Sequence, residues 1–382
     1  MNITKDIFYI GVDDKKITKF EGQFDVENGM SYNSYLIIDE KIAILDSVDA
    51  NFKDEWISNI KKALNGKKPD YLVISHMEPD HSANLANLVK IYPDITVVMN
   101  QSMQKMYLQF FKELPKNVLL VKELDELNLG KHTLKFIFAP MVHWPEVMFS
   151  YDMCDKVLFS ADAFGKFGSL DYDDPEGWAC EARRYYFGIV GKFGAQVQNV
   201  LKKLSGYDIK IIAPLHGPVL SDDLSYYLNL YDIWSSYKSE TEGVFICYAS
   251  VYGNTKKACE ILASKLEKEG IKVAIASLID EDFYESVEDA FRYDRLVLAS
   301  PTYNGGIFPV MENFIDALNA RGYKNKKIAF IENGSWAPMA RKAMQAKFNL
   351  DNVEILDEGV KILSSVSDAN LAEIDVLAKA LK

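Results

Sequence analysis

Four residues with metal-binding side chains lie close together within residues 75–82. They are His76, Glu78, Asp80 and His81, and they directly follow an apolar run at residues 71–74. Imidazole suits zinc, copper or iron, while additional carboxylates move a site toward harder ions such as iron or manganese. The spacing therefore predicts a metal site with mixed nitrogen and oxygen ligands.

The alternative for this segment is a polar turn with two incidental histidines. For any one of the four residues alone, that alternative is the better interpretation. The whole sequence has only five histidines, however, and two of them lie here beside two carboxylates. Their clustering favours the metal site.

Three further apolar runs end at residues of the same kind. His143 follows the run at 134–138, Asp162 follows 157–160, and His216 follows 209–213. Taken singly, each histidine is better explained as hydrogen-bonded near the core, and the aspartate as a turn residue or helix cap. Because loops at strand ends hold functional groups on rigid scaffolds, the recurrence predicts that all three join the metal site. His132 lies in a polar turn and is assigned no role.

A different kind of loop follows the apolar run at residues 244–248. Ser250, Gly253, Asn254 and Thr255 lie between this predicted strand and an amphipathic helix at 256–269. Hydroxyl groups and the amides of a helix N-terminus bind phosphate, and glycine allows close backbone approach. The Walker and dinucleotide-binding glycine patterns are both absent from the sequence, so a mononucleotide phosphate fits best.

Two later loops follow predicted strands of the same region. Their glycines and aromatic side chains suit a flat ring system, on which Tyr303 or Trp336 stacks. The alternative is that both aromatic residues cover surface hydrophobic groups. The candidate ring-binding residues are Pro301, Thr302, Tyr303, Asn304, Gly305, Gly306, Asn333, Gly334, Ser335 and Trp336.

The first part of the chain must hold the metal-binding residues on alternating strands and helices. Residues 31–38 and 41–46 are predicted to form neighbouring strands, and residues 53–64 form a helix with one apolar face. The turn at 75–82 is predicted to open a helix capped by Ser82 or Asp80. A strand at 95–99 and a helix at 101–111 follow, and together these elements predict a layered α/β sandwich.

From residue 241 onward strands and helices alternate regularly. Strands are predicted at 272–278, 295–300 and 327–331, and helices at 311–318 and 337–348. This order is typical of a doubly wound parallel sheet with its ligand site at the carboxyl ends of the strands. The predicted domains are therefore residues 1–240 and 241–382.

Composition narrows the functional classes. The chain has 382 residues, which is longer than a single core usually supports, and a formal net charge of -12. Nucleic acids and anionic membranes attract basic surfaces, so neither is expected as a partner. The N-terminal segment has no signal-peptide pattern and the chain has no apolar run long enough to cross a bilayer, which predicts a cytoplasmic protein.

The four cysteines, Cys154, Cys180, Cys247 and Cys259, form no C-x-x-C pair. Their spacing predicts no iron–sulfur, rubredoxin-like or structural zinc module. They are expected to be reduced and mostly buried.

The metal-binding residues in this order, followed by a flavodoxin-like region, resemble the type A flavodiiron proteins over essentially the whole chain. The resemblance implies an N-terminal metallo-β-lactamase-like αββα domain with two non-haem irons, followed by a flavodoxin-like domain that carries FMN. By family role, His76, Glu78 and His143 would bind one iron. Asp80, His81 and His216 would bind the other, and Asp162 would bridge the two.

Further implications of the resemblance concern the flavin and its partners. Ser250, Gly253, Asn254 and Thr255 would surround the FMN phosphate, and the two later loops would surround its ring. A head-to-tail homodimer, in some members a tetramer, would bring the FMN of one subunit beside the irons of the other. Tyr185 and Tyr186 match a tyrosine pair near the family's active site, whereas Gly188 stands where the family carries asparagine.

The function implied by the resemblance is reduction of O2 to water, of NO to N2O, or of both. Because the chain has neither a nicotinamide-binding fingerprint nor a rubredoxin-like module, an external electron donor is expected, either rubredoxin or a reduced deazaflavin. One alternative is a binuclear zinc hydrolase of the lactamase fold fused to a flavodoxin module, against which Glu78 counts because a carboxylate favours iron. Another is an electron-transfer protein with a vestigial metal site.

Overall fold

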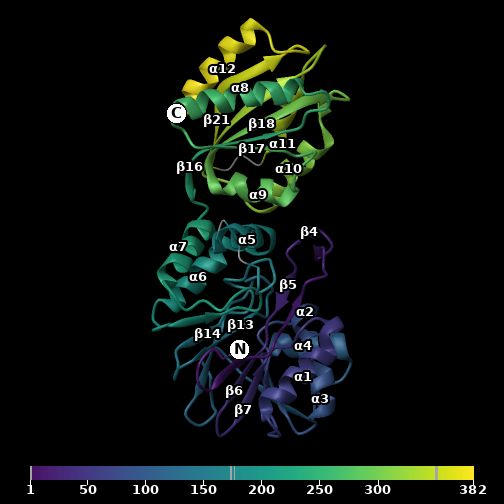
Figure 1. Cartoon of the computed structure of the whole chain (residues 1–382), viewed down its shortest axis with the longest axis vertical. Helices are drawn as coiled ribbons and strands as arrows, with labels where there is room; N and C mark the ends of the chain where they lie inside the picture. The colour runs from purple at the N-terminus through teal and green to yellow at the C-terminus, as the bar shows by residue number, and fades with distance from the viewer. Residues whose placement is uncertain (1, 173, 176, 349–351) are drawn as a thin grey trace. The chain divides into compact units, whose positions relative to one another are not determined.

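The computed structural model describes residues 2–172, 174–175, 177–348 and 352–382. The chain forms two compact units, Met1–Asp232 and Ile233–Lys382 (Figure 1). The division falls inside helix α7 (Leu224–Ser235), whereas the sequence predicts a boundary near residue 240. That predicted boundary stays a prediction.

The first unit contains two main sheets. One sheet has the strand order β1 (Ile7–Tyr9), β6 (Tyr35–Ile38), β7 (Ile42–Leu45), β8 (Tyr71–Val73), β9 (Thr96–Met99) and β10 (Asn117–Leu120). The other has the order β11 (Glu126–Asn128), β12 (Thr133–Phe138), β13 (Met148–Asp152), β14 (Val157–Phe159) and β15 (Ile211–Ala213). Two short ribbons pair β2 (Val12–Asp14) with β5 (Met30–Tyr32), and β3 (Lys19–Phe20) with β4 (Phe24–Asp25).

Helices cover both sides of this pair of sheets. Figure 1 shows α1, α3 and α4 on one side and α6 and α7 on the other, which is the predicted αββα sandwich. The helices are α1 (Lys53–Leu64), α2 (Pro79–Ser82), α3 (Leu85–Ile91), α4 (Gln101–Phe111), α5 (Trp178–Tyr185), α6 (Gly194–Leu204) and α7. The short turns of helix are η1 (Ala50–Phe52), η2 (Tyr186–Val190) and η3 (Gly191–Phe193).

Helix α1 shows how the sequence pattern produces this arrangement. Trp56, Ile57, Ile60 and Leu64 recur at helical spacing, and all four are buried against the sheet. Asn65 ends the helix in the left-handed conformation at φ 46°, a common C-terminal cap. The predicted and observed limits of this helix agree, as they do for α4.

Two local predictions in the first unit are wrong. Residues 31–38 do not form one strand, because Asn33 and Ser34 separate β5 from β6. The Asn33 side chain donates to the carbonyl of Pro214, and the Ser34 hydroxyl donates to that of Leu45 at the end of β7. Neither Ser82 nor Asp80 caps a helix at the ligand-rich turn. Glu78 precedes the one-turn helix α2, with Pro79 at its first position, and Asn84 precedes α3.

The second unit is a parallel sheet in the order β17-β16-β18-β20-β21. Numbered within the unit this order is 2-1-3-4-5, the flavodoxin-like doubly wound topology that was predicted. Its strands are β16 (Thr241–Tyr248), β17 (Val273–Ser277), β18 (Tyr293–Tyr303), β20 (Lys326–Asn333) and β21 (Val353–Ile362), with β19 (Gly306–Ile307) paired to the end of β18.

Helices lie on both faces of this sheet (Figure 1). They are α8 (Asn254–Lys268), α9 (Phe283–Arg292), α10 (Pro309–Ala320), α11 (Ala340–Lys347) and α12 (Asp368–Ala380). Leu262 and Leu266 of α8 pack with Ile374 and Leu377 of α12 against β-strand residues such as Ile246, forming one half of the core. Strands that are buried on both faces read as nearly continuous apolar runs, and β16 follows that rule.

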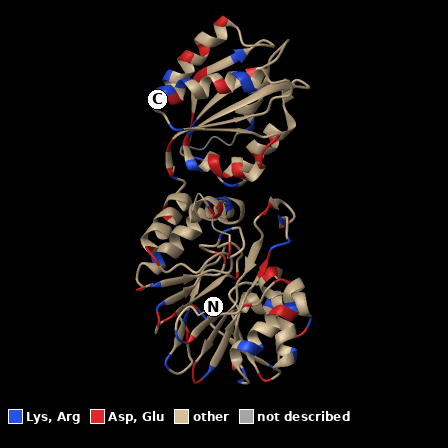
Figure 2. Ribbon diagram, viewed as in Figure 1, with Lys and Arg blue, Asp and Glu red and all other residues tan. Residues whose placement is uncertain are grey.

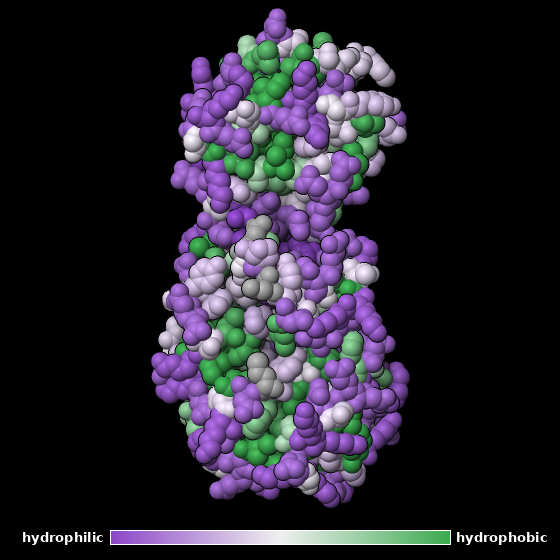
Figure 3. Space-filling model, viewed as in Figure 1, coloured by the Kyte–Doolittle hydropathy of each residue, from purple (hydrophilic) through white to green (hydrophobic). Residues whose placement is uncertain are grey.

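Both units carry acidic and basic residues, and the two kinds intermingle along the ribbon in Figure 2. Figure 3 shows apolar residues between hydrophilic ones on both units. Within the described residues, no helix is long and apolar enough to span a membrane.

All four cysteines are free. The expectation that they are mostly buried is correct for Cys247 and Cys259, whereas Cys154 and Cys180 are partly exposed.

Candidate functional site

Seven side chains from the predicted metal set converge in the first unit and form what we call the ligand cluster. Ligand atoms of His76, Glu78, His143 and Asp162 lie within 4.8 Å of one another, and so do those of Asp80, His81 and His216. The structure therefore brings all seven predicted residues together. Their assignment as iron ligands stays a prediction.

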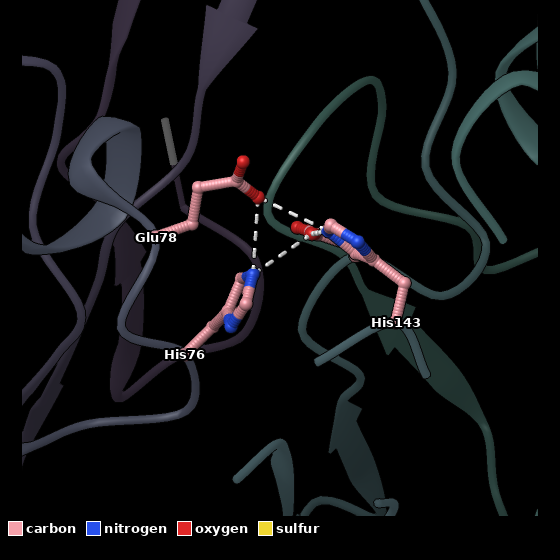
Figure 4. Close-up of side chains that lie close together, drawn as sticks. His76, Glu78 and His143 are labelled. Atoms are coloured by element: carbon pink, nitrogen blue, oxygen red, sulfur yellow. Dashed lines mark hydrogen bonds and ion pairs between the residues drawn. The ribbon is translucent and has the colours of Figure 1, made fainter. Parts of the chain in front are cut away.

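In the first group the nitrogen and oxygen atoms that could bind a metal lie close together. The Nε2 atoms of His76 and His143 lie 3.2 Å and 3.0 Å from Oε2 of Glu78 (Figure 4). Oδ2 of Asp162 completes the group at 3.0 Å from Nε2 of His143 and 3.5 Å from Nε2 of His76.

The second group has the same construction. Oδ2 of Asp80 lies 3.3 Å from Nε2 of His81 and 3.2 Å from Nε2 of His216. Oδ1 of Asp162 lies 3.2 Å and 3.8 Å from the same two nitrogens. Asp162 thus turns one carboxylate oxygen toward each group.

Strand ends position these residues. His76 and Glu78 follow β8, His143 follows β12, and Asp162 and His216 follow the adjacent parallel strands β14 and β15. Carboxyl ends of neighbouring parallel strands meet at one edge of a sheet, which is why residues far apart in sequence become neighbours. Residues next to the ligands adopt positive φ, with Ala161 at 47° and Gly217 at 76°.

Tight packing accompanies this backbone geometry. A Cβ atom on Gly217 would lie 2.6 Å from Cγ of Lys166, so a side chain after His216 would displace the loop. Sparsely populated backbone conformations of this kind persist at functional sites when the surrounding structure holds them.

Two of the histidines are oriented through their second ring nitrogen. Nδ1 of His76 donates to Oε1 of the buried Glu146 at 2.8 Å, and Nδ1 of His216 donates to the carbonyl of Ser31 at 2.7 Å. A hydrogen bond at Nδ1 leaves the lone pair of Nε2 free for a metal. Glu146 also accepts from the backbone amide of Met77 at 3.0 Å, which fixes the ligand-bearing turn.

Asn33 clamps the loop that carries His216. Its Nδ2 donates to the carbonyls of Pro214 and Gly217, both at 2.8 Å, and its amide donates to the carbonyl of Leu215 at 2.8 Å. The sequence analysis missed Asn33, Ser31 and Glu146. Only their hydrogen bonds to residues far away in the sequence identify them. A buried glutamate three residues after His143 leaves no separate pattern in a single sequence.

The electrostatics of the ligand cluster favour positive charge. Burial opposes ionisation of Glu78, but its hydrogen bonds with His143 and His76 outweigh burial and hold the Glu78 pKa well below its ordinary value. Burial lowers the pKa of His143, but hydrogen bonds to Asp162 and Glu78 raise it to about 9. Asp162 and Glu78 therefore attract a proton onto His143 when no other cation neutralises them.

Aromatic rings enclose the ligand cluster. Phe20, Tyr32 and Tyr185 lie with ring centroids 5.4 Å, 5.8 Å and 5.6 Å from that of His216, and Trp144 lies 5.2 Å from His76. Such walls exclude water and strengthen the electrostatic interactions inside.

The two predicted tyrosines have different positions. Tyr185 contacts His216 and is buried, and burial raises its pKa well above the ordinary value, so the phenol keeps its proton. Tyr186 is also buried but packs against Tyr231 at a centroid distance of 5.2 Å.

A Cβ atom on Gly188 would lie 2.7 Å from Cε1 of Phe24, so the phenylalanine occupies the space that a larger residue would need.

Several buried polar atoms of the ligand cluster make no hydrogen bond to any residue that the structure describes. They include both carboxylate oxygens of Asp80 and Oδ1 of Asp162. The Nε2 atoms of His81 and His216 face each other at 3.0 Å, an arrangement that requires either a proton on one of them or a cation that both face. Three carboxylates and four imidazoles therefore fit two metal ions.

A pocket of about 290 Å³ lies at the carboxyl ends of β16, β18 and β20 in the second unit. Ten predicted cofactor-binding residues line it: Ser250, Asn254, Thr255, Pro301, Thr302, Tyr303, Asn333, Gly334, Ser335 and Trp336. Four others, Gly253, Asn304, Gly305 and Gly306, belong to the same loops but do not line the pocket.

The N-terminus of α8 opens into this pocket. Gly253 precedes the helix with φ 83°, and Ser250 accepts a hydrogen bond from the amide of Lys256 at 3.2 Å. The first amides of a helix have no partner within the helix, so those of Asn254 and Thr255 suit a phosphate. Tyr303 and Trp336 are 48% and 83% exposed. Such exposure is expected of aromatic residues that stack on a flat ligand or contact a partner.

Three pocket residues were missed. Val251 and Tyr252 lie inside the predicted phosphate loop, and Ser364 follows β21, with its hydroxyl 2.8 Å from that of Ser335. The signal for Ser364 was available, because β21 is another parallel strand whose carboxyl end lies at the same edge of the sheet.

Comparison with known proteins agrees with this architecture. Residues 30–217 match the ODP family beta lactamase model and residues 245–356 match a flavodoxin domain. The chain is 31% identical over 365 residues to a nitric oxide reductase of Moorella thermoacetica, covering 93% of this chain and 91% of the relative. It is 30% identical to a flavo-diiron protein of Clostridium acetobutylicum, covering 97% and 96%. The chain belongs to the flavodiiron protein family.

Solved structures of other flavodiiron proteins have the same two-unit chain. The rubredoxin oxygen:oxidoreductase of Desulfovibrio gigas aligns with a TM-score of 0.90 at 26% identity, covering 100% of this chain and 98% of that one. A flavodiiron protein of Giardia intestinalis aligns with a TM-score of 0.89 at 25% identity, covering 99% and 96%. As a flavodiiron protein, the chain takes two non-haem irons and FMN as its cofactors, and the ligand cluster and the pocket fit them.

Proposed function

We propose that this flavodiiron protein reduces O2 to water, NO to N2O, or both, with electrons that pass through FMN from an external donor. The observation that carries the proposal is the placement of Asp162, whose two oxygens face two separate groups of nitrogen and oxygen donors. Two similar proteins, a nitric oxide reductase and a rubredoxin oxygen:oxidoreductase, support the same substrates.

We assign His76, Glu78 and His143 to one iron, Asp80, His81 and His216 to the other, and Asp162 to both. Two ferrous ions carry a formal charge of about four, which three carboxylates and one hydroxide nearly balance. The hard oxygen donor of Glu78 favours iron over zinc in the first group. Ser250, Gly253, Asn254 and Thr255 are assigned to the FMN phosphate and the two later loops to its ring.

When bound, the two irons and FMN together hold the four electrons needed to convert O2 to two waters. The protein supplies geometry and enclosure. Glu146 and the carbonyl of Ser31 hold His76 and His216 in one tautomer. The aromatic rings around His216 keep bulk water out of the volume in which a small gas reacts.

Tyr185 is proposed as a proton donor to the reacting gas, because its phenol keeps its proton and its ring contacts that of His216. Tyr186, whose ring packs against that of Tyr231, is proposed to keep Tyr185 in position. Tyr185→Phe should lower the turnover number about 100-fold or more, within the range of a lost general acid, without loss of iron. Tyr186→Phe should have a smaller effect. Equal turnover in wild type and Tyr185→Phe would remove Tyr185 from the mechanism.

Rubredoxin or a reduced deazaflavin is the proposed donor, and the cytoplasm is the proposed compartment, in keeping with four free cysteines. The two donors are separated by mixing each with oxidised protein and following flavin bleaching by stopped flow. A donor that reduces FMN more slowly than the protein turns over is excluded.

A head-to-tail homodimer, alone or paired into a tetramer, is proposed as the active form. Exposed Tyr252 and Trp336 at the FMN pocket supply apolar area for a second subunit to cover. Sedimentation should show a dimer or tetramer, and turnover should fall on dilution below the dissociation constant. A fully active monomer would contradict this assembly.

Metal and flavin analysis of anaerobically purified protein tests the function, together with O2 and NO consumption after photoreduction. About two irons and one FMN per chain with rapid turnover of either gas is the expected result, from the ligand count and the pocket of the second unit. Zinc in place of iron, with neither gas consumed, would instead favour a binuclear hydrolase. Unchanged gas consumption by His143→Ala would favour an electron-transfer protein with a vestigial metal site.

A further inference from the structure

A second group of ligand-type side chains lies in the first unit, apart from the ligand cluster. One ligand atom from each of His132, Cys154 and Asp155 lies within 4.8 Å of the others. The sequence assigned His132 to a polar turn without a role, and its side chain proves to be completely buried. None of these three residues takes part in the proposed reaction.

Strand pairing brings the group together. His132 directly precedes β12, and Cys154 and Asp155 lie in the turn that joins β13 to β14. Strands β12 and β13 are antiparallel, with Leu134 opposite Asp152, and the amide of Met153 donates to the carbonyl of Thr133 at 3.0 Å. The start of one strand and the end of the other therefore share one end of the sheet.

His132 is held in the way that metal-binding histidines are held. Its Nδ1 lies 3.1 Å from Oδ1 of the buried Asp152, which leaves Nε2 as the nitrogen that an ion could use. Nε2 is buried and has no hydrogen-bond partner among the described residues, although Oδ2 of Asp6 lies 3.6 Å away. A carboxylate behind a histidine fixes its tautomer in metal sites, and His76 has the same arrangement with Glu146.

Asp152 also positions the other two side chains. Its Oδ2 accepts a hydrogen bond from the amide of Asp155 at 2.8 Å, so one carboxylate holds both His132 and the turn. The thiol of Cys154 lies 3.6 Å from Oδ1 of Asp155 and is partly exposed. Solvent can therefore deliver an ion to the sulfur, while the histidine side of the group is closed.

A positive charge already sits at the edge of this group. Nζ of Lys131 lies 2.9 Å from Oδ2 of Asp6 and 3.9 Å from Oδ1 of Asp155. The side chain of Lys131 is 55% exposed, so it can move into solvent when another cation takes its place. Exposed pairs of this kind are held by only about 0.2 to 1 kcal/mol.

We propose that His132, Cys154 and Asp155, with Asp6 as a fourth ligand, bind a divalent ion of borderline softness, with Zn²⁺ as the best match. One sulfur, one imidazole nitrogen and two carboxylate oxygens make a four-coordinate set that zinc accepts. Such an ion would tie the segment before β1 to the turn between β13 and β14. The sequence analysis excluded a zinc module built on paired cysteines, and this site needs only one.

The experiment uses iron- and FMN-loaded protein at mildly alkaline pH, where thiol and imidazole lose their protons most easily. N-ethylmaleimide labelling of Cys154 is followed by mass spectrometry with and without Zn²⁺. Zinc should slow the labelling of Cys154 about ten-fold or more, because the free thiolate is the reactive form. Cys180, also partly exposed, provides the control within the same sample and should label equally in both.

Two variants sharpen this result. Asp155→Asn should abolish the protection, and Lys131→Gln should reach half-protection at about two- to five-fold less zinc, since the competing ammonium is gone. Cys154→Ser should consume O2 or NO at the wild-type rate, because the residue lies outside the ligand cluster.

Cobalt gives a readout that does not depend on thiol reactivity. The ligand cluster has no cysteine, so a thiolate-to-Co²⁺ absorption band that wild type shows and Cys154→Ser lacks reports this site. The band should appear in wild type and be absent from Cys154→Ser. No band in wild type, or zinc protection that persists in Asp155→Asn, would overturn the proposal and leave His132 as an ion-paired imidazolium between Asp152 and Asp6.

Discussion

At the scale of single residues, the ligand cluster depends on groups that touch no metal-facing atom. Glu146 accepts from Nδ1 of His76 and from the amide of Met77, and it is almost fully buried. Its charge offsets the positive charge that an imidazole acquires when its other nitrogen binds a cation. A cluster of seven correct ligands would still bind metal poorly if their rings could rotate.

The first prediction concerns this support. Glu146→Gln keeps the shape but removes the charge behind His76, and the affinity for iron should fall about 10- to 100-fold. Iron retained after dialysis against a graded series of chelator concentrations measures the change. Glu123→Gln, which removes a glutamate charge from an exposed pair with Lys203, should retain iron like wild type. Identical retention by all three proteins would mean that Glu146 does not support His76.

At the scale of elements, helix ends and strand ends are coupled to the ligand cluster. The Oδ1 atom of Asn100 caps α4 by accepting from the amides of Ser102 and Met103, both at 2.9 Å. Its Nδ2 donates to the carbonyl of Glu146 at 2.7 Å. The same side chain therefore begins a helix and fixes the residue that orients His76.

The second prediction separates these two roles. Asn100→Asp keeps the cap but loses the donor to Glu146, so it should lower the affinity for iron and destabilise the protein by about 1 to 3 kcal/mol through an unpaired buried carbonyl. Calorimetric Tm and iron content measure the two effects.

The control for Asn100 is another helix cap. Ser367 caps α12 in the second unit by accepting from the amide of Asn370. Ser367→Ala should cost about 1 kcal/mol and leave iron content unchanged. Equal iron content in Asn100→Asp and Ser367→Ala would show that the bond to Glu146 has no effect on the metals.

At the scale of the whole molecule, each unit contains one cofactor site and responds to pH in its own way. Lys326 begins β20 of the second unit, where its buried ammonium donates to the carbonyl of Phe291 and the hydroxyl of Ser239, both at 2.7 Å. Burial lowers the pKa of Lys326 to about 7. The unfolded chain, with an ordinary lysine pKa, binds this proton more tightly than the folded one.

The third prediction follows from that difference. Between about pH 7 and pH 10 the unfolded state holds more protons, so Lys326 should raise the free energy of unfolding with pH by about 1 kcal/mol per unit. The Tm of wild type should therefore rise relative to that of Lys326→Met between pH 7 and pH 9. Unfolding is monitored through the fluorescence of the FMN that the protein releases. Lys327→Met, at an exposed neighbouring position, should follow wild type. Parallel pH profiles for wild type and Lys326→Met would refute the assignment.

Three features could be predicted from the sequence: the fold class, the loops that line the pocket of the second unit, and the residues that meet in the ligand cluster. Helix α1 was predictable to its last residue because its apolar positions obey the helical period. The ligand residues were predictable because His76, His143, Asp162 and His216 all follow apolar strands. Local patterns of this kind are set by neighbours in the chain, and one sequence is enough to find them.

The tertiary structure was needed to show which of these residues meet and what holds them in place. The two oxygens of Asp162 separate the ligands into two groups, and Asn33, Ser31 and Glu146 hold them from distant strands. The same holds for His132, which the sequence placed in a polar turn without a role but whose side chain is buried beside Asp152. Such contacts arise when strands far apart in sequence align in a sheet, and no local period records which side chains will meet.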